Sequence, residues 1–112
     1  MFTIDTDEED QFTVDLYDAE EHIGYVNVVR ARVRVCKGST YIWETHSRLN
    51  EKYHKTGLGI CMYAEAIRHA KKSGYTITSS RAPSAQAQRL WTSKTLNSMF
   101  SIIRFHFRWW VK

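Results

Sequence analysis

A glycine-containing turn holds the residues whose types and spacing best suit ligand binding. The segment from Leu49 to Gly59 reads Leu-Asn-Glu-Lys-Tyr-His-Lys-Thr-Gly-Leu-Gly, with Gly57 and Gly59 two positions apart. An expected strand precedes this segment and an expected helix follows it. Glycines let the backbone approach a ligand, while the free amides and the dipole of a helix start attract anions. The pattern predicts a phosphate-binding turn, although a plain strand-to-helix turn uses the same glycines.

Polar side chains stand directly before these glycines, at His54, Lys55 and Thr56. A cation or a hydroxyl is useful beside a phosphate, although an ordinary solvated loop has the same composition. We therefore expect the backbone groups of these residues to bind more than their side chains do. Glu51, slightly earlier in the segment, is expected at the surface.

Glu44 and His46 are the candidates for acid–base chemistry. They are two positions apart in an alternating segment, so both point to one face of the strand expected there. Either could accept a proton from a substrate, directly or through a water molecule. The competing interpretation is an exposed cross-strand pairing with the arginines of the preceding strand, Arg30, Arg32 and Arg34.

Length and composition limit the classes of protein. A chain of 112 residues with 43% hydrophobic residues predicts a single domain over 1–112, with residues 1–10 as an acidic lead-in that is either an edge strand or disordered. No apolar run reaches membrane-spanning length, and the acidic start is unlike a secretory signal. Cys36 and Cys61 predict neither a disulfide framework nor a zinc site. We expect a cytoplasmic protein that uses no metal and no membrane.

Charge is distributed unevenly along the chain. Residues 1–21 hold nine of the twelve acids and no Lys or Arg, although the whole chain has a net charge of +4. Residues 22–112 carry sixteen bases against three acids, a net charge of +13. Such a surface attracts nucleic acid, an acidic protein or a phosphorylated coenzyme, or it is simply a soluble basic surface.

Hydrophobic periodicity predicts the elements that position these residues. Alternation of apolar and polar residues predicts strands over 11–18, 22–36, 41–49, 75–80 and 100–112. Helical spacing predicts helices over 60–72 and 83–96. The order is β-β-β-α-β-α-β, an α/β (α+β) fold with a mixed, mostly antiparallel sheet.

The expected C-terminal strand is rich in aromatic residues. Its alternation predicts one face with Ile103, Phe105, Phe107, Trp109 and Val111, and an opposite face with Arg104, His106, Arg108, Trp110 and Lys112. We expect this strand to contribute to the core and to an interface. As an exposed edge it invites pairing with another chain, so we predict a homodimer.

The order of elements resembles the acyl-CoA N-acyltransferase fold of the GNAT superfamily. The family motif Arg/Gln-x-x-Gly-x-Gly/Ala is similar to His54-Lys55-Thr56-Gly57-Leu58-Gly59 here, and Leu49-Asn50-Glu51-Lys52-Tyr53 resembles the lead-in to it. The segment from Ser84 to Trp91 looks like the later family motif that contains an Asn, an Ala and a Leu-Tyr pair. The resemblance covers about residues 11–99.

The resemblance implies binding of acetyl-CoA as co-substrate. It implies that the backbone of the glycine turn, from His54 through Lys55, Thr56, Gly57 and Leu58 to Gly59, holds the pyrophosphate. The strand end at Leu49, Asn50 and Glu51 would pair with the pantetheine amides, and Ser84 and Trp91 would contact the coenzyme. Ser84 could equally be a helix N-cap.

Departures from the family pattern affect the chemistry. His54 replaces the Arg or Gln, and Trp91 stands where the family often has a Tyr that protonates the coenzyme thiolate. An indole cannot serve as that acid. The N-terminal helix pair that usually walls the acceptor site is expected to be absent, which favours an amine on a macromolecule such as a protein. Small members like this one occur in phages and mobile elements.

We therefore expect an acetyl-CoA-dependent N-acetyltransferase. A non-catalytic binding protein on the same fold is one alternative, favoured by His54 and Trp91. A basic nucleic-acid-binding module is the other, with the arginine row as its contact surface.

Overall fold

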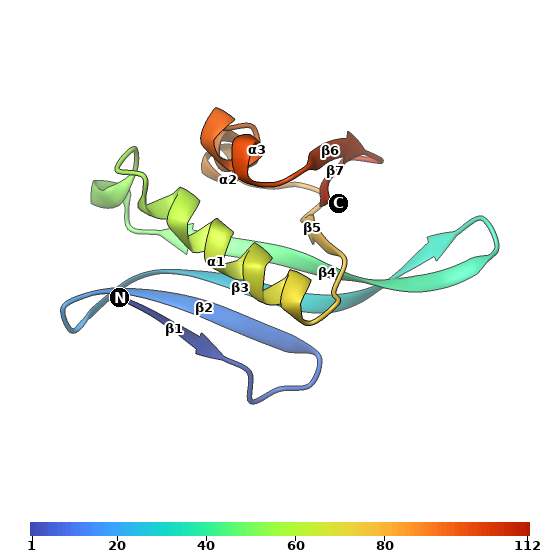
Figure 1. Cartoon of the computed structure of the whole chain (residues 1–112), viewed down its shortest axis with the longest axis horizontal. Coiled ribbons are helices and arrows are strands. Elements are labelled where there is room, and N and C mark those ends of the chain that lie inside the picture. Colours follow the sequence, from blue (N-terminus) through green and yellow to red (C-terminus); the bar gives the residue numbers. More distant parts are fainter.

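The computed structural model describes the backbone of residues 1–112 and every side chain except that of Val35. Its centre is a seven-stranded sheet in the order β1-β2-β3-β4-β5-β7-β6 (Figure 1). Neighbouring strands are antiparallel, apart from the parallel pair β4–β5. The strands are β1 Phe2–Asp5, β2 Gln11–Asp18, β3 Glu21–Val35, β4 Gly38–Leu49, β5 Ile77–Ser79, β6 Ile102–Phe105 and β7 Arg108–Val111.

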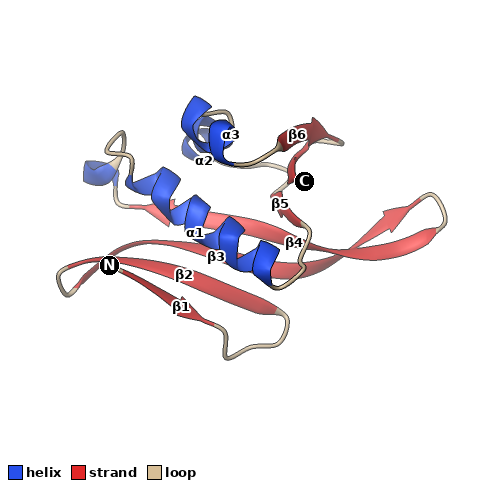
Figure 2. Cartoon of the chain, viewed as in Figure 1, coloured by secondary structure: helices blue, strands red, loops and turns tan.

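One long helix covers one face of this sheet. Helix α1, Leu58–Lys72, lies across the strands and contacts β2, β3, β5 and the two short helices (Figure 2). These short helices are α2, Ala85–Trp91, and α3, Lys94–Met99, and a single 3-10 turn, η1, spans Glu51–Tyr53. No helix within the described residues has the length and hydropathy needed to cross a membrane.

The core lies between α1 and the sheet, as the alternation predicts. Phe12, Val14 and Leu16 of β2 are all buried, and each points toward the helix side. The apolar stripe of α1 buries Met62, Tyr63, Ala66, Ile67 and Ala70 against them. Because the alternate strand residues face the other side, Glu44 of β4 lies on the face that α1 does not cover.

The N-terminal residues form an edge strand. β1 pairs with β2 from Phe2–Leu16 to Asp5–Thr13. Of the two alternatives for residues 1–10, an edge strand or a disordered segment, the edge strand is therefore correct. Only residues 6–10 connect β1 to β2. The helix pair expected to be absent is indeed not found at this position in the described chain.

Residues 83–96 form two helices instead of the single helix that the periodicity predicts. α2 ends at Trp91, and Ser93 caps α3 by accepting a hydrogen bond from the Leu96 amide through Oγ. Serine is a strong N-cap because its oxygen binds an otherwise unpaired amide of the first turn. The break at Thr92 and Ser93 therefore restarts the helix in a new direction.

The prediction of one C-terminal strand over 100–112 is wrong. β6 and β7 form a hairpin whose two turn residues, His106 and Phe107, have φ of 48° and 66°. Ile103 pairs with Trp110, and Phe105 pairs with Arg108. Directly paired residues share one face, so Ile103 and Phe105 lie on the same face as Arg108 and Trp110, not on the opposite one.

The β3–β4 hairpin extends beyond the rest of the sheet as an arm (Figure 1). Here Arg30 pairs with Trp43, Arg32 with Tyr41, and Arg34 with Ser39. The guanidinium of Arg30 lies 4.6 Å from the centre of the Tyr41 ring. The arginine row therefore lies on the face opposite Glu44.

Candidate active site

A cleft opens where β4 and β5 separate. The two strands pair only through Trp43–Ile77, Glu44–Thr78 and Thr45–Ser79. β5 then ends, whereas β4 continues to Leu49. The cleft has a volume of about 140 Å³ and is lined by Thr45, His46, Ser47, Tyr63, Ser80, Ala82, Pro83, Ser84, Ala87 and Trp91. Pockets that enclose drug-sized ligands hold roughly 300–1,000 Å³, so this cleft can enclose only one end of a large ligand.

The backbone of β4 presents unpaired groups to this cleft. The Trp43 amide donates a hydrogen bond to the Thr76 carbonyl on the β5 side of the strand. Backbone groups two residues apart in a strand point the same way, so the amide and carbonyl of Ser47 also face the β5 side. No β5 residue lies opposite Ser47, because the register ends at Thr45–Ser79. These groups can pair with the amide groups of an extended ligand.

Tyr63 and Trp91 form the inner wall of the cleft. Both side chains are buried, and their rings meet edge to face with centres 5.3 Å apart. The Tyr63 hydroxyl lies 2.6 Å from Ser47 Oγ. Burial raises the pKa of Tyr63 to about 12, against the opposing effect of its hydrogen bonds. This hydroxyl stays protonated at neutral pH and can donate a hydrogen bond into the cleft.

The two glycines of the turn have different roles. Gly57 is the N-cap of α1 with φ of 88°, and a Cβ there would meet nothing within 4 Å. Gly59 is buried, and a Cβ on it would lie 3.0 Å from Leu90 of α2. Gly57 therefore allows the positive φ of the turn and leaves open space beside it, whereas Gly59 permits close packing of α1 on α2.

Free amides follow Gly57 at the start of α1. The first intrahelical hydrogen bond runs from the Cys61 amide to the Gly57 carbonyl. The Leu58 amide points to Thr56 Oγ1 at 3.4 Å. The amides of Gly59 and Ile60 precede that first bond and have no partner within the described backbone. They are the donors that an anion at this turn would use.

The side chains before the glycines stabilise the turn itself. His54 Nε2 lies 2.8 Å from the Leu49 carbonyl, and Thr56 Oγ1 donates to the Tyr53 carbonyl. Lys55 is exposed and has φ of 62°. Leu49 is buried at the end of β4, while Asn50 and Glu51 are exposed at the start of η1. The imidazole of His54 is thus already engaged with the backbone.

Ser84 is an N-cap, one of its two expected roles. Its Oγ accepts a hydrogen bond from the Ala87 amide at the start of α2. It also lines the cleft together with Trp91, which is seven residues, or about two helical turns, further along the chain. The contact of either residue with a coenzyme stays a prediction.

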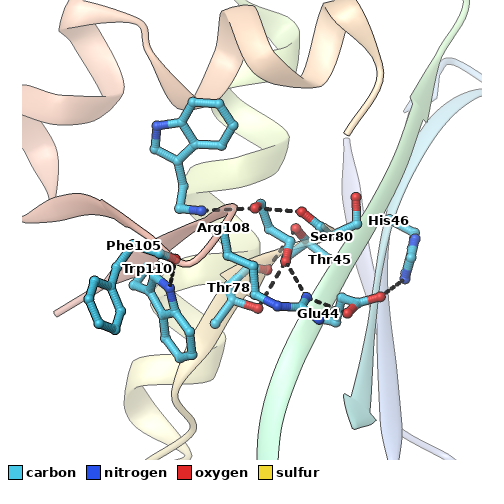
Figure 3. Close-up of polar contacts among 10 residues, drawn as sticks. Glu44, Thr45, His46, Thr78, Ser80, Phe105, Arg108 and Trp110 are labelled. Carbon is cyan, nitrogen blue, oxygen red and sulfur yellow. Dashed lines mark hydrogen bonds and ion pairs between the residues drawn. The ribbon is translucent and has the colours of Figure 1, made fainter. Parts of the chain in front are cut away.

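Glu44, His46 and Arg108 form a connected set on the side of the sheet away from α1 (Figure 3). Arg108 Nη1 donates to Glu44 Oε2 at 2.5 Å, and His46 Nε2 lies 2.8 Å from Glu44 Oε1. The carboxylate is therefore bound on both oxygens. The competing interpretation, a pairing of Glu44 with Arg30, Arg32 and Arg34, is wrong because those arginines occupy the other face of β3.

Arg108 is held in place by the end of β5. Its Nη1 also donates to the Ser79 carbonyl at 3.0 Å, and the neighbouring Trp109 amide donates to Ser79 Oγ. With its side chain only 10% exposed, Arg108 is largely enclosed. Arg108 holds the Glu44 carboxylate in place, and that carboxylate binds Nε2 of His46. The His46 imidazole is half-exposed, and its Nδ1 has no assigned partner among the described residues. His46 can therefore accept a proton at Nδ1.

Two residues of this site, Tyr63 and Arg108, are not indicated as functional by the motifs of the sequence. Tyr63 falls in the apolar stripe of the helix expected over 60–72, where a single tyrosine among Ala and Ile is a signal for a polar partner. Arg108 was assigned to the outer face of a continuous strand. No pattern near Arg108 indicates Glu44, which lies 64 residues earlier in the chain. No cluster of three or more potential metal ligands occurs among the described side chains.

Comparison with known proteins supports the fold. No family model matches the sequence, and no curated protein matches it significantly. The structure is similar to the crystal structure of the acetyltransferase of GNAT family from Streptococcus pneumoniae, with a TM-score of 0.58 and 16% sequence identity. The match covers 94% of this chain and 67% of that one. The chain therefore has the same fold as this GNAT-family acetyltransferase.

Proposed function

We propose that this protein is an acetyl-CoA-dependent N-acetyltransferase whose acceptor is an amine on a protein. The observation that carries the proposal is the cleft between β4 and β5, which opens beside the unpaired backbone of Ser47. The start of α1 supplies free amides for a diphosphate. Tyr63 lies five residues after Leu58, about 7.5 Å further along the helix axis. One extended coenzyme could therefore reach from the glycine turn to the cleft.

The residues present fit the two ends of acetyl-CoA. The Gly59 and Ile60 amides can bind the pyrophosphate, and Gly57 leaves open space beside it. The amide and carbonyl of Ser47 can pair with a pantetheine amide. The small cleft then encloses the acetyl thioester, which is the end of the coenzyme that reacts.

His46 is the proposed general base. In this proposal the acceptor amine attacks the thioester carbonyl, so that a C–N bond forms and the C–S bond breaks. His46 Nδ1 takes the proton of the amine, while Glu44 and Arg108 hold the imidazole in the correct tautomer. Glu44 is thus a positioning residue in this proposal, because both of its oxygens are already bound.

Tyr63 is the proposed stabiliser of the leaving sulfur. Trp91 cannot donate a proton to a thiolate, but its ring packs against the Tyr63 hydroxyl side of the same cleft. With a pKa of about 12, Tyr63 is a weak acid, so it offers a hydrogen bond to the thiolate. The thiolate then takes its proton from water.

Calorimetric titration with acetyl-CoA tests the binding step. Gly57→Glu places a carboxylate at the proposed diphosphate position and should abolish binding by charge repulsion. Gly74→Glu is the matched control, because Gly74 also has a positive φ, 75°, and open space around its Cβ position. Equal loss in both variants would attribute the effect to backbone strain, and absence of binding to the unaltered protein would refute the proposal.

An acetylation assay on protein substrates then tests the chemistry. His46→Ala should lower kcat by about 10²–10⁴-fold, the usual contribution of a general base, while the calorimetric affinity for acetyl-CoA stays unchanged. Binding of acetyl-CoA without any transfer would instead support a non-catalytic protein on the same fold.

A further inference from the structure

A second, larger hollow lies between the C-terminal hairpin and the β3–β4 arm. It has a volume of about 850 Å³. We call it the hairpin groove, lined by Arg32, Val33, Arg34, Thr76, Arg81, Ile103, Phe105, His106, Phe107, Arg108, Trp110, Val111 and Lys112. Its hairpin wall lies on the sheet face that carries Glu44, because Trp110 pairs with Thr78 and Thr78 with Glu44. Arg32 and Arg34 belong to the opposite face of β3 and line the groove from the arm.

The hairpin groove is basic. Four arginines and Lys112 line it, and none of the described lining residues is acidic. Among the described lining residues, only Arg108 forms an ion pair with a carboxylate of the chain, that of Glu44. The acids of residues 1–21 lie on β1, β2, their turns and the first residue of β3, toward the other edge of the sheet. The potential in the groove is therefore positive and favours an anionic partner.

Exposed aromatic rings lie beside these charges. The residues Phe105 and Phe107 are 57% and 66% exposed, and Ile103 is 42% exposed. Large apolar side chains in contact with each other and open to solvent are typical of interaction surfaces. The groove thus offers apolar contacts and cations together.

β6, whose Ile103 and Phe105 line the groove, has an open edge on the side away from β7. β6 is the last strand of the sheet, so its outer backbone groups have no partner strand within the chain. A peptide can bind such an edge by adding a strand, with its own amides and carbonyls as partners. A nucleic acid has no backbone that matches this spacing, so the edge favours a peptide.

The hairpin groove is connected to the proposed base. Arg108 lines the groove and also holds Glu44, which holds His46. A segment bound against the hairpin wall of the groove therefore lies on the same sheet face as His46.

We propose that the hairpin groove binds an extended acidic segment of the acceptor protein and so delivers a nearby amine to His46. This inference rests on the proposed acetyltransferase function. The acidic side chains pair with Arg34 and Arg81, the backbone pairs with β6, and apolar side chains pack on Phe105 and Phe107. The amine itself lies outside the groove, because the basic groove would repel a protonated amine.

Fluorescence anisotropy with labelled peptides tests binding without any coenzyme. The probe is a short extended peptide with one lysine followed by a run of glutamates and leucines, and its control has glutamine in place of glutamate. We expect the acidic peptide alone to bind, with affinity falling as salt rises. The charge-reversed variant Arg34→Glu/Arg81→Glu should weaken binding at least about tenfold.

Lys72→Glu/Lys94→Glu is the matched control variant. It makes the same change in net charge at exposed positions of α1 and α3 outside the groove. Equal weakening in both variants would overturn the proposal, because net charge alone would then explain the binding. Equal binding of the glutamine peptide, or preferential binding of single-stranded oligothymidylate, would overturn it as well. Salt-sensitive self-association that only Arg34→Glu/Arg81→Glu removes, without peptide binding, would identify a second copy as the occupant.

The two proposals fail in different ways. If acetyl-CoA does not bind in calorimetry, the acetyltransferase proposal fails whatever the peptides do. If acetyl-CoA binds but KM for the acidic and glutamine peptides is the same, only the groove proposal fails. If both hold, Arg34→Glu/Arg81→Glu raises KM for the acidic peptide and leaves kcat unchanged.

Discussion

Replacing Arg108 by methionine should destabilise the protein strongly, because it leaves Glu44 without its cation. The two side chains are 10% and 21% exposed, so neither charge is well hydrated. Removing one partner of a buried ion pair costs about 3–5 kcal/mol. Glu44 retains His46 and some solvent, which lowers the cost, but the lost bond to the Ser79 carbonyl adds about 1 kcal/mol.

We therefore expect Arg108→Met to lower the free energy of unfolding by about 3 kcal/mol, or to lower Tm by roughly 12 °C for a domain of this size. Urea denaturation followed by circular dichroism measures the change, and an unaltered m-value shows that the unfolded state is comparable. Glu44→Gln should cost about 1–2 kcal/mol, because the Arg108 guanidinium still donates to the Ser79 carbonyl and to the neutral amide oxygen of the new glutamine.

A double-mutant cycle isolates the pair itself. Arg108→Met/Glu44→Gln should be more stable than the sum of the single variants predicts, with a coupling energy of about 2 kcal/mol. Strict additivity would show that Arg108 stabilises the hairpin only through Ser79. The assignment of Glu44 as a carboxylate fixed by Arg108 would then be wrong.

Two further predictions concern the core. Gly24→Ala should cost about 2–3 kcal/mol, because its Cβ would lie 2.9 Å from the Arg48 carbonyl oxygen and 3.0 Å from Met62 Sδ; a thermal shift near zero would show that the backbone yields. Burial raises the pKa of Tyr63 from 10.0 to about 12, so the unfolded chain releases this proton first and stability falls across that range. In the Tyr63→Phe variant, the loss of unfolding free energy between pH 10 and pH 12 should be smaller by about 2–3 kcal/mol. Urea midpoints at successive pH values measure this loss, and an unchanged dependence on pH would contradict the prediction.

The elements with a long hydrophobic periodicity are predictable from the sequence. β2, β3, β4 and α1 each continue one pattern over eight or more residues, and each is found where expected. The C-terminal hairpin was missed because its turn, His106-Phe107, contains neither glycine nor asparagine, the usual signals for positive φ. The alternation therefore runs through the turn unbroken.

Contacts in the site are predictable from the sequence only where the two residues are close together in the chain. Glu44 and His46 are neighbours on one strand, so their contact follows from spacing alone. The contact of Tyr63 with Ser47 requires the crossing of α1 over β4, and that of Arg108 with Glu44 requires both the hairpin turn and the pairing of β7 with β5. Such contacts depend on the assembled sheet and leave no mark in a short stretch of sequence.

The short parallel pairing of β4 with β5 affects how a bound ligand stabilises the sheet. It contains three register pairs, and β7 adds one pair to β5 on its other side. A molecule in the cleft touches β4 and α1 on one wall and the segment from Ser80 to Trp91 on the other. Bound ligand thus connects two halves of the sheet that share few contacts of their own, and its binding free energy adds to the free energy of unfolding. A ligand in the cleft would therefore add contacts across a joint that contains only three register pairs within the described backbone.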